Sequence, residues 1–203
     1  MKKNNEMDVV FLLDRSGSMS GMENDTIGGY NSYIDSQKDN NVKVTTVLFD
    51  DKYEMISNRV NIKDVKKLTN KTYFVRGCTA LLDAIGKTIN FIDSKNPNKV
   101  IFIITTDGLE NASKEYNKEK IRKLIKKHNN WEFMYIGADI DSFSESESIG
   151  ISRKNTANYK KDKKGTNLLF SAVGKASRSY YEDSKIDACW CEELSEYVNN
   201  NMN

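Results

Sequence analysis

The chain has 203 residues and a formal net charge of +2, from 31 basic and 29 acidic side chains. This length allows one domain of ordinary size with a full hydrophobic core, plus short appendages. Because the two charge signs are largely interspersed, the composition gives no field that favours a nucleic acid or a membrane surface as a partner. A hydrophobic content of 38% and a single proline indicate a globular protein without proline-rich linkers.

Cysteine usage and the length of the apolar segments bear on the compartment. The three cysteines are an odd number, and Cys189 and Cys191 are too close in sequence to form a useful disulfide staple. The apolar run 9–13 is too short for a signal peptide, because Asp14 ends it. No other stretch approaches the ~20 apolar residues of a membrane span. We therefore expect a soluble, cytoplasmic protein.

The first half of the chain alternates between strand and helix patterns. The apolar run 8–13 is typical of a strand buried on both faces, and residues 24–37 carry apolar side chains at helical spacing. A second buried strand is predicted over 42–49. The pair Asp50-Asp51 then interrupts a β pattern that resumes over 53–60, which indicates a tight turn and an antiparallel edge strand.

The same alternation continues to the middle of the chain. Helical stripes over 80–92 and 115–128 are followed by apolar runs over 100–105 and 131–137, respectively. Strands that alternate with helices predict an α/β fold. We expect a doubly wound, mostly parallel, Rossmann-like sheet of about six strands, flanked by helices on both faces.

The pattern weakens beyond Gly137. Residues 141–150 are rich in serine and glutamate, which weakens the signal, and 151–156 offers only a poor sixth strand. A helix is again indicated over 166–181. The last strand of the sheet therefore has the weakest pattern in the sequence.

The C-terminal segment is predicted to be a small addition to the domain. Leu194 and Val198 favour a terminal helix, and Trp190 between two cysteines favours a buried anchor over a metal site, since two sulfurs cannot complete a tetrahedron. We assign one domain to residues 1–183 and a helical appendage with a frayed tail to residues 184–203.

A carboxylate and two hydroxyls follow the first predicted strand. Asp14, Ser16 and Ser18 stand at alternate positions, and Gly17 lets the backbone bend so that their side chains converge. In an open α/β sheet, ligands bind at the carboxyl edge of the strands, where the strand order reverses. Hard oxygens with few charges suit Mg²⁺, which keeps several of its waters. The loop therefore predicts a site for a divalent cation.

Two later segments end at the same edge if this topology is right. Thr79 in Gly77-Cys78-Thr79 opens the helix predicted over 80–92, and Asp107 in Thr106-Asp107-Gly108 follows the strand predicted over 100–105. Five oxygen-bearing side chains, two carboxylates and three hydroxyls, can then meet at one place. A soft thiolate would be misplaced among them, so Cys78 is interpreted as a tolerated small side chain.

Over residues 7–180 the sequence resembles a von Willebrand factor type A domain with a metal-ion-dependent adhesion site, of the bacterial intracellular or phage-borne type. The matching motifs are D-x-S-x-S from Asp14 to Ser18, G-x-T-x-L around Thr79, and T-D-G around Asp107. The second loop departs from the family pattern, because Arg76 and Cys78 flank Gly77 where small residues are usual.

The resemblance implies how the site would work. Asp14, Ser16 and Ser18 would hold Mg²⁺ or Mn²⁺, with Ca²⁺ less suitable, while Thr79 and Asp107 exchange direct and water-mediated roles. One coordination position is left for the carboxylate of a Glu or Asp on a protein partner. The implied function is a metal-dependent protein-protein interaction module that is not an enzyme.

Other interpretations remain open. Asp14 has an ordinary role as a turn cap, and Thr79 as a helix N-cap. A Mg²⁺-dependent phosphotransfer or hydrolytic enzyme would use Asp14 as its nucleophile, but Ser16 stands where such enzymes need a second aspartate. A von Willebrand factor A fold that has lost metal-dependent binding is a further alternative.

Four other features are assigned to structure. Gly86-Lys87-Thr88 lacks the first glycine of a phosphate-binding loop and lies in a predicted helix. The lysine run 160–164 and Arg76 are interpreted as hydrated surface. His128, the single histidine, lies at a helix end, where we expect a surface role.

Overall fold

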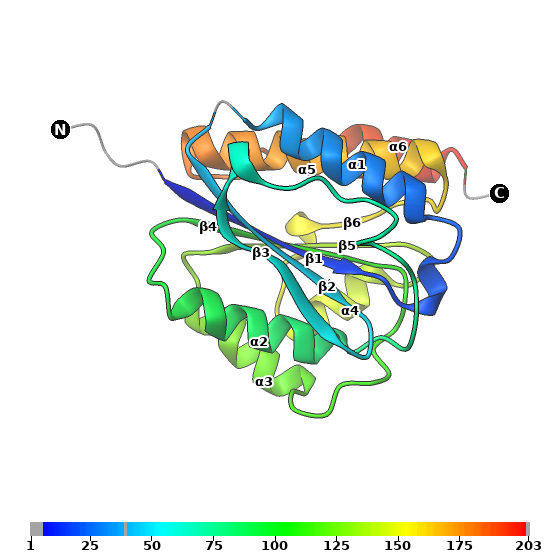
Figure 1. Ribbon diagram of the computed structural model, residues 1–203, viewed down its shortest axis with the longest axis horizontal. Helices are drawn as coiled ribbons and strands as arrows, with labels where there is room; N and C mark the ends of the chain where they lie inside the picture. Colours follow the sequence, from blue (N-terminus) through cyan, green and yellow to red (C-terminus); the bar gives the residue numbers. More distant parts are fainter. Residues whose placement is uncertain (1–5, 39, 202–203) are drawn as a thin grey trace.

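A mixed sheet of six strands forms the middle layer of the molecule, with helices on both of its faces (Figure 1). The computed structural model describes residues 6–38 and 40–201. The strands are β1 (Met7–Asp14), β2 (Val42–Phe49), β3 (Tyr53–Asn61), β4 (Val100–Thr106), β5 (Glu132–Gly137) and β6 (Thr156–Asn158). Their order is β3-β2-β1-β4-β5-β6; β3 runs antiparallel to β2, and the other neighbouring pairs are parallel. The predicted fold class is confirmed.

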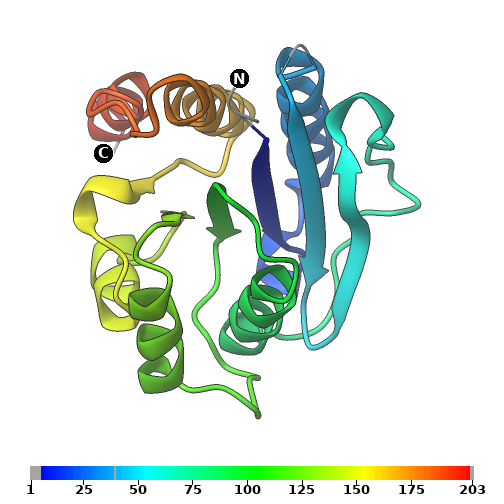
Figure 2. The same ribbon diagram turned by 90° about the vertical axis from the view of Figure 1, so that its left-hand side faces the viewer.

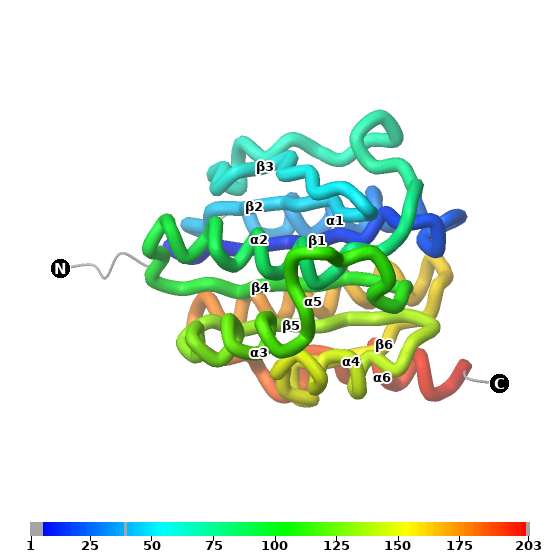
Figure 3. The backbone as a smooth tube through the Cα atoms, turned by 90° about the horizontal axis from the view of Figure 1, so that it is seen from below, coloured from blue at the N-terminus to red at the C-terminus, as the bar shows by residue number. Residues whose placement is uncertain are grey.

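Helices pack against each face of the sheet. They are α1 (Glu23–Ser36), α2 (Leu81–Asp93), α3 (Lys118–Lys127), α4 (Ser142–Ile149), α5 (Lys163–Asp183) and α6 (Glu192–Asn199). Short 3-10 turns cover Gly17–Met19, Ile62–Asp64 and Arg153–Asn155. Figure 2 shows α1, α5 and α6 on one face and α2, α3 and α4 on the other. Seen from below, α2 and α3 lie in front of the sheet and run roughly along its strands (Figure 3).

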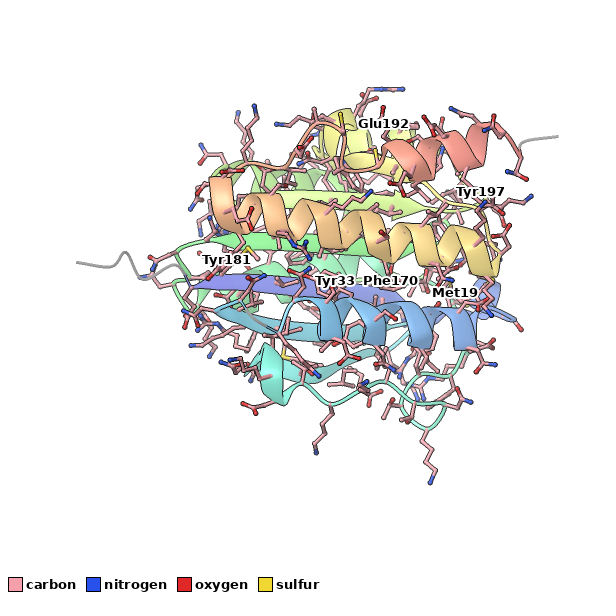
Figure 4. The ribbon with its side chains drawn as sticks, turned by 90° about the horizontal axis from the view of Figure 1, so that it is seen from above. Met19, Tyr33, Phe170, Tyr181, Glu192 and Tyr197 are labelled. Carbon is pink, nitrogen blue, oxygen red and sulfur yellow. The ribbon has the colours of Figure 1, made fainter. Side chains whose placement is uncertain are left out.

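The two faces of the sheet carry separate hydrophobic clusters, because alternate strand residues point to opposite sides. Val9 and Phe11 of β1 belong to the cluster that α1 and α5 complete, whereas Val10 and Leu12 belong to the cluster that α2 completes. Helices α1 and α5 lie side by side (Figure 4). All residues of β1 are buried. Burial on both faces explains why this strand is a continuous apolar run in the sequence.

The structure corrects the sequence interpretation beyond Gly137. The serine- and glutamate-rich segment 141–150 contains α4, which buries Ser142, Ser146 and Ile149. A sixth strand does form, but β6 begins only at Thr156, and the rest of the range predicted for it consists of two residues without regular structure and a 3-10 turn. The helix is capped at both ends, by the Asp141 side chain, which accepts from the Ser144 amide at 3.0 Å, and by Gly150 in the left-handed region, whereas its buried serines give no hydrophobic pattern.

The C-terminal segment packs on the same core as the rest of the chain. Trp190 is 2% exposed and donates its indole N–H to the carbonyl of Lys154 at 2.9 Å, so it is the buried anchor that was expected. Leu194 of α6 joins the cluster of α1 and α5. The domain boundary at residue 183 stays a prediction, and residues 202 and 203 of the expected frayed tail lie outside the described residues.

His128 is buried, contrary to the surface role expected for it. Its ring is 6% exposed and stacks on Trp131 with the ring centroids 4.2 Å apart. The residue follows α3 and precedes β5, which places it at the amino edge of the parallel strands. Among the helices of the described residues, none has the length and apolar character needed to cross a membrane.

Candidate metal-binding site

The predicted site residues meet at the carboxyl edge of the sheet, where the strand order reverses. Asp14 ends β1 and Asp107 follows β4, and these two strands are neighbours although α1, β2, β3 and α2 separate them in the chain. Thr79 lies just before α2. The topology therefore brings three loops, which we call the first (residues 14–18), second (76–80) and third (106–111) loops, to one place.

Hydrogen bonds fix the side chains of the first loop. Asp14 Oδ1 accepts from the Ser16 amide at 2.7 Å, and Asp14 Oδ2 accepts from the Thr106 hydroxyl at 2.6 Å. The Ser16 and Ser18 hydroxyl oxygens are 3.0 Å apart, and Ser18 Oγ donates to Asp107 Oδ1 at 2.6 Å. The first and third loops thus share one hydrogen-bonded network that includes four of the five predicted ligands.

Backbone groups join the first loop to the second. The Gly17 amide donates to the carbonyl of Gly77 at 3.1 Å, and the Arg76 amide donates to the carbonyl of Arg15 at 2.9 Å. Gly77 has a φ of +66°, in the left-handed region where a side chain is strained. The Tyr73 hydroxyl also donates to the carbonyl of Asp14. The glycine between Arg76 and Cys78 is therefore required by the bend that carries the second loop to the site.

Thr79 is positioned by the third loop and does not cap a helix. Its amide donates to Asn111 Oδ1 at 2.9 Å, and its carbonyl accepts from the Asn111 amide at 3.0 Å. The N-cap of α2 is Ala80, and the Leu82 amide of its first turn donates to Glu110 Oε2 at 2.8 Å. Because Glu110 accepts the hydrogen bond from this amide at the N-terminus of α2, the Thr79 hydroxyl is not needed as a helix cap and is available to the site.

Gly108 lines the space between the three hydroxyls. A Cβ atom at this position would lie 2.9 Å from Thr79 Oγ1, 3.1 Å from Ser18 Oγ and 3.7 Å from Ser16 Oγ. The three hydroxyl oxygens therefore surround a cradle that only glycine leaves open. A larger residue would fill the space in which a small cation fits.

The two carboxylates of the site are removed from water. Asp14 is fully buried and Asp107 is 5% exposed. Burial raises the pKa of the Asp14 carboxyl to about 6, although the hydrogen bonds from Thr106 and Ser16 act to lower it. Its ionised form would gain from a nearby cation, since burial without a counter-charge disfavours a negative carboxylate.

The donor set fits a hard divalent cation. The described residues contain no cluster of three or more His, Cys, Asp or Glu side chains that could hold a metal, so the candidate ligands are two carboxylates and three hydroxyls. Oxygen ligands with few charges suit Mg²⁺ or Mn²⁺ rather than a soft ion. The geometry brings together all the residues that the sequence predicts: Asp14, Ser16, Ser18, Thr79 and Asp107.

Sequence reasoning missed several residues that shape the site. Asn111 holds Thr79, and Lys161, from the predicted hydrated run, lies with its Nζ 2.7 Å from Asp107 Oδ2. Arg76 does not simply face water, because its Nε donates to the buried Asp50 at 2.7 Å. Nothing in the local pattern marks Asn111 or Lys161, since distant contacts determine both roles.

Comparisons with known proteins agree with the fold. No family model matches the sequence, and no curated protein matches it significantly. Among solved structures, proximal thread matrix protein 1 from the mussel byssus superposes with a TM-score of 0.62 and 17% identity, over 83% of this chain and 45% of that one. The vWF domain of the pilus tip protein Mfa5 from Porphyromonas gingivalis gives 0.66 and 9%, over 90% and 98%. Manganese-loaded TRAP from Plasmodium vivax gives 0.58 and 17%, over 82% and 74%.

These likenesses define the class of fold. At such low identities they show the architecture alone, which is that of the von Willebrand factor type A domains. The chain spans less than half the length of the mussel protein and nearly all of the Mfa5 domain. The fold expected from the motifs around Asp14, Thr79 and Asp107 is thus confirmed, whereas the metal site stays a prediction.

Proposed function

We propose that this chain is a metal-dependent protein-interaction module. Asp14, Ser16 and Ser18 would hold Mg²⁺ or Mn²⁺, together with Thr79 and Asp107 directly or through water. A divalent cation bound there supplies an open coordination position that takes up a carboxylate oxygen from a Glu or Asp of a partner protein. The chain's own residues provide the rest, because they fix the five ligands in place and exclude bulk water from the buried carboxylates.

The convergence at Gly108 carries this proposal. Three hydroxyls from two separate loops surround a space that a single methyl group would fill. A buried aspartate also lies at the carboxyl end of each of the two central strands, Asp14 as the last residue of β1 and Asp107 just after β4. Ordinary turn formation explains the Asp14 contact with the Ser16 amide, but it does not require Thr79 and Ser18 to face the same point. A cation site requires that convergence.

Two solved structures of similar fold support the proposal of a divalent metal. The mussel protein has been solved with zinc in its MIDAS motif, and the TRAP structure is described as manganese-loaded. We extend this chemistry to the present chain as part of the proposal. We also propose a cytoplasmic setting in a bacterium or its phage, which is compatible with three free cysteines.

A calorimetric titration tests the metal. We expect Mg²⁺ and Mn²⁺ each to give saturable heat and a rise in melting temperature with the wild-type chain, and neither with Asp14→Ala. Absence of both signals in the wild type would contradict the proposal and favour a fold that has lost metal-dependent binding. A pull-down with and without EDTA then asks whether an acidic partner leaves with the ion.

The enzymatic alternative has weak support in the geometry. Ser16 occupies the place where a phosphotransfer enzyme needs its second aspartate, and the single histidine lies at the opposite edge of the strands. We expect no turnover of a generic phosphate ester in the presence of Mg²⁺. Robust turnover that disappears in Asp14→Asn would overturn the non-catalytic assignment.

A further inference from the structure

A lysine from outside the predicted motifs reaches the candidate metal site. Lys161 lies in the loop between β6 and α5, 143 positions after Ser18 in the chain. Its Nζ nevertheless donates to the carbonyl of Ser18, in the first loop, at 2.8 Å. The same Nζ is 2.7 Å from Asp107 Oδ2 and 3.8 Å from Asp139 Oδ2. The Lys161 side chain is 23% exposed, whereas that of Asp107 is fully buried. The ammonium therefore approaches the site from its solvent side.

The lysine covers the oxygen of Asp107 that is otherwise free. Asp107 Oδ1 accepts the hydrogen bond from Ser18, while Oδ2 is buried and has no hydrogen-bond partner of good geometry. The contact between Lys161 and Oδ2 is thus an ion pair that provides charge without a well-directed hydrogen bond. A buried carboxylate oxygen without a counter-charge is unfavourable, so the ammonium stabilises the site in the absence of a metal.

The backbone around Lys161 is anchored on both sides. The Tyr159 amide donates to the carbonyl of Gly137 at 2.9 Å, and Asp162 caps α5 by accepting from the Gly165 amide at 2.7 Å. The Tyr197 hydroxyl of α6 donates to Asp162 Oδ2 at 2.9 Å, and Figure 4 shows Tyr197 at the same end of the molecule as Met19. The ammonium can therefore leave Asp107 by rotation of its own side chain, while the loop stays in place.

We propose that Lys161 is a built-in competitor of the divalent cation for Asp107. Its ammonium neutralises the carboxylate when no metal is bound and withdraws toward solvent when a metal binds. This inference rests on the proposed function, because it concerns the same site. It assigns to Lys161 a role in setting how tightly the site holds its metal, in addition to the residues that would ligate the ion.

Substitution of the lysine tests the competition. In Lys161→Met we expect Mg²⁺ to bind about tenfold more tightly or better, because the substitution removes both the competitor and a like charge within a few Å of the ion. The matched control is Lys160→Met, which removes the same charge one position away. Lys160 Nζ contacts Asp162 and the carbonyl of Asn201 and makes no contact with the ligand set. Its affinity for Mg²⁺ should equal that of the wild type.

Amine labelling gives a second measurement on the unaltered protein. With a lysine-directed acylating reagent and mass spectrometry, Lys161 should react slowly in EDTA and several-fold faster in saturating Mg²⁺, because the released ammonium becomes accessible. Lys160 serves as the internal reference, and its reactivity should not change. This measurement does not depend on whether Lys161→Met folds as well as the wild type.

The outcomes separate this inference from the proposed function. Tighter binding in Lys161→Met than in the wild type, with Lys160→Met unchanged, supports the competition. Equal affinity in the wild type and Lys161→Met, or Lys161 labelling that Mg²⁺ leaves unchanged, overturns the competition while the metal site stands. No Mg²⁺ binding in the wild type or in either lysine variant overturns both.

Discussion

Two buried aspartates at the same edge of the sheet, Asp50 and Asp14, have hydrogen-bond donors of different charge. Asp50 follows β2, and its Oδ2 accepts hydrogen bonds from Arg15 Nε at 2.8 Å and Arg76 Nε at 2.7 Å. Asp14 ends β1, and its carboxylate accepts hydrogen bonds from the Ser16 amide and the Thr106 hydroxyl. Both side chains are fully buried. One carboxylate has permanent cationic partners in the protein, and the other has only neutral donors.

The pKa values of the two groups follow this difference. Burial raises the pKa of Asp50, but the hydrogen bonds from Arg76, the Lys52 amide and Arg15 outweigh it, and the pKa is lowered overall. For Asp14, burial prevails and raises the pKa to about 6. Neighbouring residues in the sequence, Asp14 and Arg15, thus belong to two different electrostatic systems. The Asp14 carboxylate has neutral donors and suits a cation that can exchange. Arg15 instead forms a permanent buried ion pair with Asp50.

The largest effect on this difference between Asp50 and Asp14 is expected from removal of the buried Arg15 guanidinium. Arg15→Met should lower the free energy of unfolding by about 3–5 kcal/mol, because it breaks a fully buried ion pair and leaves Asp50 under-compensated. Urea unfolding followed by circular dichroism measures the loss. Lys52→Met is the control, since Lys52 is exposed and the hydrogen bonds given for it with Asp50 come from its backbone amide and carbonyl, which the substitution keeps. A loss below about 1 kcal/mol in Arg15→Met would mean that Arg76 alone balances Asp50.

A methyl group added at Gly108 tests the Asp14 side of the comparison, that is, the candidate cation site. Gly108→Ala should weaken Mg²⁺ binding about tenfold, because the added Cβ lies 2.9 Å from Thr79 Oγ1 and displaces a ligand. Its backbone needs no left-handed φ, so the fold should persist. Gly28→Ala in α1 is the control, since nothing lies within 4 Å of the new atom. Unchanged affinity in Gly108→Ala would argue against a cation between the three hydroxyls.

The smallest expected effect is a change in acid sensitivity. Because the pKa of folded Asp50 is lowered below 3.8, its stabilising contribution is present above that pH and is lost as the pH falls through the folded value. Arg76→Met should move the folded pKa back toward the ordinary value. The free energy of unfolding should then decrease less between about pH 7 and about pH 3 than in the wild type. Identical pH profiles would show that Arg76 does not set this pKa.

The buried strands could be predicted from the sequence because both of their faces are covered. The run 8–13 corresponds to β1 (Met7–Asp14), and 100–105 corresponds to β4 (Val100–Thr106), with shifts of one residue at the ends. Continuous apolar runs of this kind leave few alternatives. The positions of Asp14 and Asp107 followed directly, since a residue just after a parallel strand lies at the carboxyl edge.

The rest of the structure depends on contacts that leave no periodic signal. Helix α4 buries serines, and β6 has only three residues, so neither produces a hydrophobic pattern. His128 is buried by its stacking on Trp131, although lysines precede it in the sequence. Lys161 belongs to a run of charges that usually indicates hydrated surface, yet the fold of the β6–α5 loop carries it to Asp107.

The amide and carbonyl groups that join Gly17 to Gly77 and Arg15 to Arg76 have a consequence for protein engineering. Because these backbone hydrogen bonds hold the loops together, exposed side chains beside the site can be exchanged without loss of these contacts. Leu109 is 56% exposed, and Cys78 is also exposed. If the proposed function holds, combinatorial variation at these two positions should change which partner protein binds, while the three hydroxyls around Gly108 keep their positions.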